Sequence, residues 1–112
     1  MNSQELLDKC VSWAKEKKAQ DIMSMDLRGI SLIADYFLLA TAGNTRQAQA
    51  IADYLKEEAE TLANPPLRME GYNQGRWILL DFGSVIVHIF MAEERQYYNL
   101  ERLWGDAPRQ NY

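Results

Sequence analysis

The sequence predicts a single α/β domain in which a mixed five-stranded sheet is flanked by helices. Apolar residues recur at helical spacing near the amino end and in the middle of the chain, which indicates two amphipathic helices. Short apolar runs of strand length lie between and after them. Because these helices and strands share one domain-sized chain of 112 residues, helices packed on a sheet are the expected architecture.

The chain is predicted to open with a helix that begins at Asn2 or Ser3. Apolar side chains line one face of this segment, and either residue can serve as the N-cap. After the first residue of Asp21–Leu27, a set of side chains that includes polar residues alternates with a set that is entirely apolar. This is the period of a strand with one dry face.

A central strand and the longest helix are predicted next. Asp35–Ala42 is continuously apolar, which indicates a strand covered on both faces. Gly43-Asn44-Thr45 opens a helix whose apolar residues step by three and four. Asn64-Pro65-Pro66 ends it, because proline cannot continue the helical hydrogen bonds.

Three more strands and a last helix complete the predicted fold. The strands are Leu67–Glu70, Trp77–Phe82 and Val85–Met91. Gly83-Ser84 separates the latter two, which therefore form an antiparallel hairpin. Glu93–Trp104 is predicted to be one helix. Its side chains expected to close the core are Tyr97, Leu100 and Trp104.

Composition narrows the classes of function for this domain, residues 1–112. No run of roughly 20 apolar residues and no secretory signal is found, so we expect no membrane contact. The single cysteine, Cys10, cannot form an internal disulfide, which favours a reducing cytoplasm. A net charge of −4 disfavours direct nucleic-acid binding and makes a basic protein the easier partner.

The residues that could carry chemistry do not assemble into a centre. His88, the only histidine, lies on a predicted strand where hairpin pairing places it opposite Leu79 rather than near Asp81. A structural or interface role is therefore favoured over a catalytic one. With Cys10 as the only thiol, a zinc site has no ligand set. We expect no catalytic residue, no metal and no cofactor.

An enzymatic alternative remains open at this stage. Asp26, Asp35 and the Gly43-Asn44 turn would be the site of a small magnesium-dependent nucleotidyltransferase-like enzyme. Neither aspartate belongs to a D-x-D pair, and a helix cap is the favoured interpretation of the turn. A third interpretation is an RNA-binding module that uses Arg95, Arg102 and the aromatic residues, which the acidic balance disfavours.

The aromatic residues are the strongest indication of function. Trp77 begins a strand after the loop G-Y-N-Q-G, and Tyr98 points to a different side of its helix from Tyr97. Aromatic anchors near arginine and leucine are typical of protein interfaces. We therefore favour partner contact for Trp77 and Tyr98, whereas core and contact roles are balanced for Trp104.

Four stretches of the chain together span most of residues 20 to 107. They are A-D-Y-F-L-L-A-T-A-G-N-T-R-Q, E-G-Y-N-Q-G-R-W-I-L-L-D-F-G, V-I-V-H-I-F and R-Q-Y-Y-N-L-E-R-L-W-G-D-A. In order and spacing they resemble the Iojap-like family of bacterial ribosomal silencing factors.

The resemblance implies a fold similar to nucleotidyltransferases, without their catalytic carboxylates. It implies binding to large-subunit ribosomal protein fourteen on the free large subunit, which would block joining of the small subunit and lower translation under nutrient limitation or in stationary phase. A role in late large-subunit maturation is also implied. The sequence leaves open whether the free protein forms a homodimer through the same aromatic surface.

The resemblance also implies which residues form the binding face. Five match the family's contact positions, and three further ones are placed there less firmly. The first group is Trp77, Tyr98, Asn99, Leu100 and Glu101, and the second is Asp81, His88 and Trp104.

Overall fold

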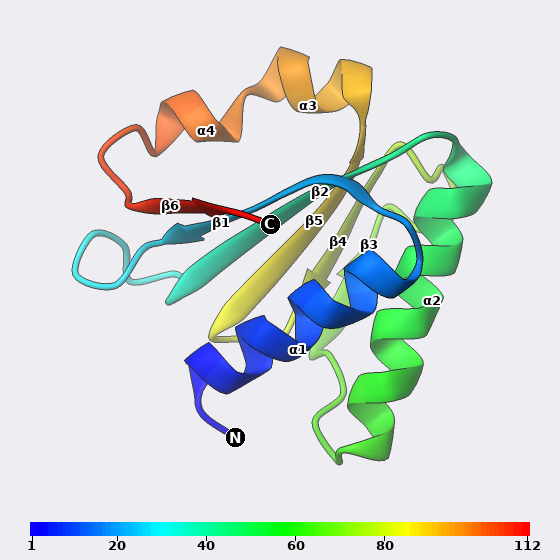
Figure 1. Ribbon diagram of the computed structural model, residues 1–112, viewed down its shortest axis with the longest axis horizontal. Coiled ribbons are helices and arrows are strands. Elements are labelled where there is room, and N and C mark those ends of the chain that lie inside the picture. Colours follow the sequence, from blue (N-terminus) through cyan, green and yellow to red (C-terminus); the bar gives the residue numbers. More distant parts are fainter.

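One six-stranded mixed sheet forms the centre of the computed structural model, which describes residues 1–112 (Figure 1). The strand order is β3-β4-β5-β2-β1-β6, and neighbours run antiparallel except for the parallel β2–β5 pair. The predicted class, helices packed on a mixed sheet, is confirmed. The elements are α1 (Ser3–Glu16), β1 (Gln20–Asp26), β2 (Tyr36–Ala42), α2 (Thr45–Thr61), β3 (Arg68–Glu70), β4 (Trp77–Asp81), β5 (Val85–Met91), α3 (Ala92–Tyr98), α4 (Leu100–Leu103) and β6 (Arg109–Asn111).

Helices α1 and α2 cover one face of the sheet (Figure 1). Each begins at an asparagine N-cap: the Asn2 side chain accepts from the Glu5 N–H, and the Asn44 side chain accepts from the Gln47 N–H, both at 2.8 Å. These bonds satisfy backbone donors that have no partner inside the helix. The predicted caps are therefore confirmed, and the Gly43-Asn44 turn is used by α2 itself.

Strand β2 is the most buried part of the sheet. All seven of its residues are buried, as its continuous hydrophobicity predicts. Its alternate side chains enter two separate cores: Leu38 packs under α1 and α2, and Leu39 packs on the opposite face. Both faces of the sheet therefore need a cover.

The second face is covered by α3 and α4, which lie across the sheet from α1 and α2 (Figure 1). Neither of these short helices contains a buried residue. The core beneath them holds eight buried residues, compared with 22 on the other face. This thinner cover leaves apolar and aromatic side chains near the surface.

The predicted strand count of five is wrong, because the carboxyl end adds a sixth strand. β6 pairs antiparallel with β1, with Ser24 opposite Gln110. Its three residues are polar and exposed, so the sequence contains no apolar pattern that predicts a strand there. Beyond it, the Tyr112 hydroxyl lies 2.9 Å from the Ser24 hydroxyl and fastens the end of the chain.

The predicted single helix over Glu93–Trp104 is also wrong, because the chain breaks at Asn99. Asn99 adopts left-handed backbone angles (φ 49°), and its side chain accepts from the Arg102 N–H to cap α4. The break rotates α3 relative to α4, so Tyr97 is 82% exposed instead of closing the core. None of the helices of the structure has both the length and the apolar character needed to cross a membrane.

We expect Gly71→Ala to destabilise the fold far more than Gly29→Ala. Both glycines have left-handed backbone angles, so each substitution carries a strain of about 1–2 kcal/mol. A Cβ at Gly71 would also overlap the Trp77 carbonyl oxygen, whereas Gly29 has open space around it. Urea unfolding followed by circular dichroism measures the difference. Equal losses of unfolding free energy in the two variants would contradict the predicted overlap.

Candidate partner-binding surface

Six rings meet on the face of the sheet that α3 and α4 cover. Trp77, at the start of β4, lies between Phe90 of β5 and Tyr98 of α3, with ring centroids 4.9 and 4.6 Å away. Phe37 of β2 lies 4.7 Å from the His88 ring and meets Trp104 edge-on at 6.1 Å. We call this set the aromatic cluster: Phe37, Trp77, His88, Phe90, Tyr98 and Trp104.

The aromatic cluster is buried at its base and open at its rim. Phe37, His88 and Phe90 are buried, Trp77 and Trp104 are half-buried, and Tyr98 is 51% exposed. The structure thus brings the predicted contact residues Trp77 and Tyr98 together at the rim. An aromatic side chain with a packed base and an exposed edge is the type of residue that dominates binding energy at interfaces.

His88 lies at the base, with 4% of its surface exposed. The hairpin places it opposite Leu79 and places Asp81 opposite Ile86, as the sequence predicts. Its Nδ1 accepts a hydrogen bond from the Trp77 indole N–H at 3.1 Å. Burial lowers the pKa of His88 to about 4, so the ring is neutral near pH 7. These contacts make His88 a support for Trp77.

Asp81 lies at the end of β4, and both of its carboxylate oxygens accept hydrogen bonds from groups of the same chain. One oxygen accepts from the Gly83 N–H at 2.8 Å and shapes the turn between β4 and β5. The other accepts from Arg68 at 3.1 Å. Arg68 therefore partly neutralises the carboxylate, whose side chain is 16% exposed.

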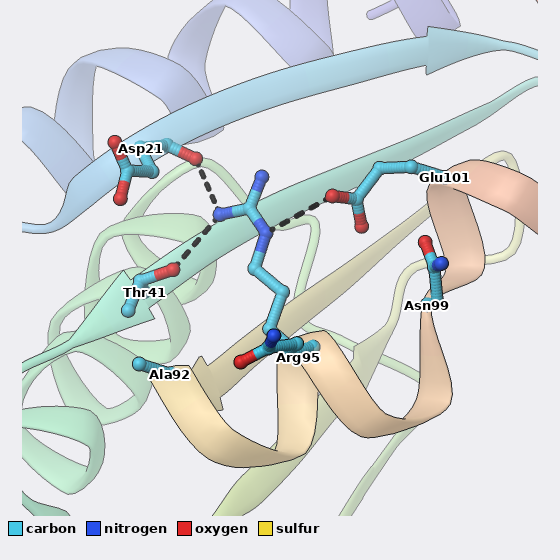
Figure 2. Close-up of a pocket in the computed structure, with 7 residues that line it drawn as sticks. Asp21, Thr41, Ala92, Arg95, Asn99 and Glu101 are labelled. Atoms are coloured by element: carbon cyan, nitrogen blue, oxygen red, sulfur yellow. Dashed lines mark hydrogen bonds and ion pairs between the residues drawn. The ribbon is translucent and has the colours of Figure 1, made fainter.

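Glu101 points into a polar pocket of about 310 Å³ beside Arg95 (Figure 2). The Arg95 guanidinium donates to the Asp21 carbonyl oxygen and to the Thr41 hydroxyl, and its Nε lies 3.6 Å from the Glu101 carboxylate. One arginine of α3 thus joins β1, β2 and α4. Glu101 helps to hold the α3–α4 segment on the sheet, whereas Tyr98 packs on Trp77.

The remaining predicted contact residues lie in the same segment. Leu100 and Trp104 are half-buried and pack on the second core, so both contribute to closing it. Asn99 is exposed and forms the break between the helices. Leu100 and Trp104 therefore combine a packing role with a partly exposed surface.

One residue from each of the two alternative functions is engaged in structural contacts. Asp26 forms a salt bridge with Arg28 at 2.8 Å, which holds the pKa of this carboxyl below its usual range. No three His, Cys, Asp or Glu side chains are grouped so that they could hold a metal ion. Arg95, a residue of the RNA-binding interpretation, is mostly buried in its contacts with the sheet and Glu101.

The sequence contains no local signal for the anchoring role of Arg95. Its partners Asp21 and Thr41 are 74 and 54 residues away along the chain. The contact with Glu101 depends on the break at Asn99, which helical periodicity does not reveal. Asp21 itself adopts left-handed angles (φ 48°) at an irregularity in the β1–β2 pairing, next to the carbonyl that Arg95 binds.

Comparison with known proteins gives one consistent family. Residues 1–112 match the family described as "Ribosomal silencing factor during starvation". The chain is 49% identical over 108 residues to ribosomal silencing factor RsfS of Halalkalibacterium halodurans, a match that covers 96% of this chain and 92% of the relative. Identity to the Bacillus subtilis protein of the same name is 45%, with the same coverage.

Two further similarities extend this relation. A solved structure from Chromobacterium violaceum superposes with a TM-score of 0.91 at 28% identity, covering 94% of this chain and 88% of that one. A mouse protein named mitochondrial assembly of ribosomal large subunit protein 1 is 31% identical over 101 residues. That match covers 88% of this chain and 44% of the mouse protein.

We expect the unfolding free energy to fall by about 3 kcal/mol between pH 7 and pH 4 through His88 alone. The pKa is lowered from 6.5 to about 4 on folding, so in this range the unfolded chain binds a proton that the folded chain excludes. The contribution is fully present above pH 6.5 and is lost as the pH falls towards 4. Urea unfolding of wild type and His88→Leu at several pH values measures it. Parallel pH profiles would contradict this assignment.

We expect Arg95→Met to lower the unfolding free energy by about 2 kcal/mol, because it leaves the inward-facing Glu101 without its cation. Arg102→Met, in the same segment but exposed, should change it by less than about 0.5 kcal/mol. Amide hydrogen exchange should also quicken in α3 and α4 of the Arg95 variant. Unchanged exchange there would show that the guanidinium does not anchor the segment.

Proposed function

This chain belongs to the ribosomal silencing factor family, and on that premise we propose that it represses translation by binding the free large ribosomal subunit. The bound protein sterically blocks joining of the small subunit. Such a block lowers protein synthesis when nutrients are limited or in stationary phase. It involves no chemical turnover, so the proposed function is regulatory rather than enzymatic and uses no cofactor.

We propose large-subunit ribosomal protein fourteen as the direct partner, in the cytoplasm. The family resemblance supports this choice, and the name of the mouse relative connects that protein with the large ribosomal subunit. A role in late maturation of the large subunit is part of the same proposal. In the free protein, the aromatic rim is the proposed surface for a homodimer.

The observation that carries the proposal is the packed and partly exposed Trp77–Tyr98 pair. Trp77 packs on Phe90 of the sheet and Tyr98 packs on Trp77, so the side-chain freedom lost when a partner covers them is reduced. A basic protein also suits the neighbouring surface. There, a pocket of about 300 Å³ is lined by two acids and two tyrosines, Glu93, Glu94, Tyr97 and Tyr98.

The proposed contact residues fall into two groups by their position. Trp77 and Tyr98 form the centre of the contact, with Asn99, Leu100 and Trp104 along the adjoining α3–α4 segment. Asp81, Glu101 and His88 act through other residues, because each is engaged by Arg68, Arg95 or Trp77. A surface of about 800 Å² around this pair would be a standard share of an interface.

Trp77→Ala and Tyr98→Ala should each weaken binding to purified large subunits by roughly 30-fold or more, the effect of losing an interface anchor worth about 2 kcal/mol. Co-sedimentation at increasing subunit concentration measures the affinity. Addition of wild-type protein should also shift joined ribosomes towards free subunits. Leu62→Ala removes a partly exposed apolar side chain at the end of α2 and should bind as wild type does.

Circular dichroism distinguishes loss of contact from loss of fold in these variants. Retained binding in both aromatic variants would exclude the proposed surface. Absence of wild-type protein from the large-subunit fraction would exclude the proposed function itself.

A further inference from the structure

The polar edge of Trp77 is turned away from solvent. Its indole N–H donates to His88 Nδ1 at 3.1 Å, although the ring belongs to the half-exposed rim. The ring faces are covered by Phe90 and Tyr98. The indole is therefore held by two aromatic contacts and one hydrogen bond, and the bond is the polar contact that distinguishes one edge of the ring from the other.

Packing alone does not explain why a histidine occupies position 88. It lies between Phe37 and Phe90, whose ring centroids are 4.7 and 5.7 Å from its own. Because Nδ1 accepts a hydrogen bond, the proton of the neutral ring lies on Nε2. Nε2 is buried, and no protein group accepts from it. An apolar side chain would fill this site without burying an unpaired donor.

We propose that His88 is a positioning residue that orients the Trp77 indole for the partner and does not itself touch the partner. This inference rests on the proposed function and specifies which part of the Trp77 ring faces the partner. Since the N–H is already bound, Trp77 presents only carbon atoms at the rim. With both ring faces covered and only the C–H edge exposed, the partner group that meets it is an apolar side chain and not a cation or a hydrogen-bond acceptor for the indole.

The physical reason is preorganisation. A tryptophan that turns freely about its side-chain bonds must be ordered when the partner binds, and that loss of freedom weakens the complex. The hydrogen bond from a buried, rigid strand residue imposes the order in advance. Its benefit appears in binding, whereas its disadvantage, a buried polar group, appears in folding.

Two substitutions of matched shape separate these effects. His88→Asn places an acceptor oxygen near the position of Nδ1, and His88→Leu has nearly the same shape without an acceptor. We expect His88→Leu to be the more stable of the two and the weaker binder of large subunits, by about 5- to 10-fold relative to wild type. His88→Asn should recover part of that affinity.

A double-mutant cycle assigns the effect to the indole N–H. Trp77→Phe keeps an aromatic ring but has no N–H, so adding His88→Leu to it should change the affinity by less than about 2-fold. Equal losses from His88→Leu in both backgrounds would overturn the proposal. So would wild-type affinity in His88→Leu.

Nuclear magnetic resonance provides a readout independent of the ribosome. The Trp77 indole proton, identified by its loss in Trp77→Phe, should exchange with solvent at least about 10-fold faster in His88→Leu. The indole proton of Trp13, in the core on the other face of the sheet, serves as the internal control and should not change. Unchanged exchange at Trp77 would overturn the positioning role, whether or not the protein binds ribosomes. If wild type exchanges slowly but binds no subunits, the proposed function fails and the inferred partner fails with it.

Discussion

The complete burial of strand β2 is the constraint on which the rest of the structure depends. A strand with seven buried residues at the centre of a sheet must be covered on both faces. Amphipathic helices α1 and α2 provide one cover through long stripes of buried residues. The other cover is the last part of the chain, which folds over Phe37 and Leu39 as two short helices. The cores on the two faces are consequently unequal in size.

The thin cover connects stability with function. Helices α3 and α4 contain no buried residue, so hydrophobic burial alone holds them weakly on the sheet. Arg95 supplies the missing attachment by joining the segment to β1 and β2 (Figure 2). With the segment attached in this way, Tyr98 lies on Trp77 and the rim of the aromatic cluster stays exposed. The same residues thus close the fold and form the proposed contact.

The acidic side chains near this surface form ion pairs with arginines of the same chain. Asp81 is paired with Arg68, Glu94 with Arg76 and Glu101 with Arg95. Each pairing reduces the field that the carboxylate presents to a partner and orders the backbone around the rim. Glu93, whose side chain is 88% exposed, shares Arg76 with Glu94. Attraction to a basic partner therefore depends mainly on the overall charge of −4.

The sequence by itself determined the parts of the fold that depend on local patterns. The N-cap at Asn2, the cap of α2 at Asn44, the buried strand at Tyr36–Ala42 and the pairing of His88 with Leu79 all follow from spacing and turn chemistry. The family resemblance placed Trp77 and Tyr98 on one binding face, whereas spacing along the chain did not bring them together.

Only the tertiary structure decided the remainder. Polar β6 is held by backbone hydrogen bonds to β1, which no apolar pattern encodes. The break at Asn99 turns Tyr97 outward and Glu101 inward, since both orientations depend on how α3 and α4 lie on the sheet. The bonds from Arg95 to Thr41 and from Trp77 to His88 join different elements, and neither appears before the chain has folded. Helical and strand periods describe contacts between near neighbours, whereas these contacts form only when distant segments share one surface.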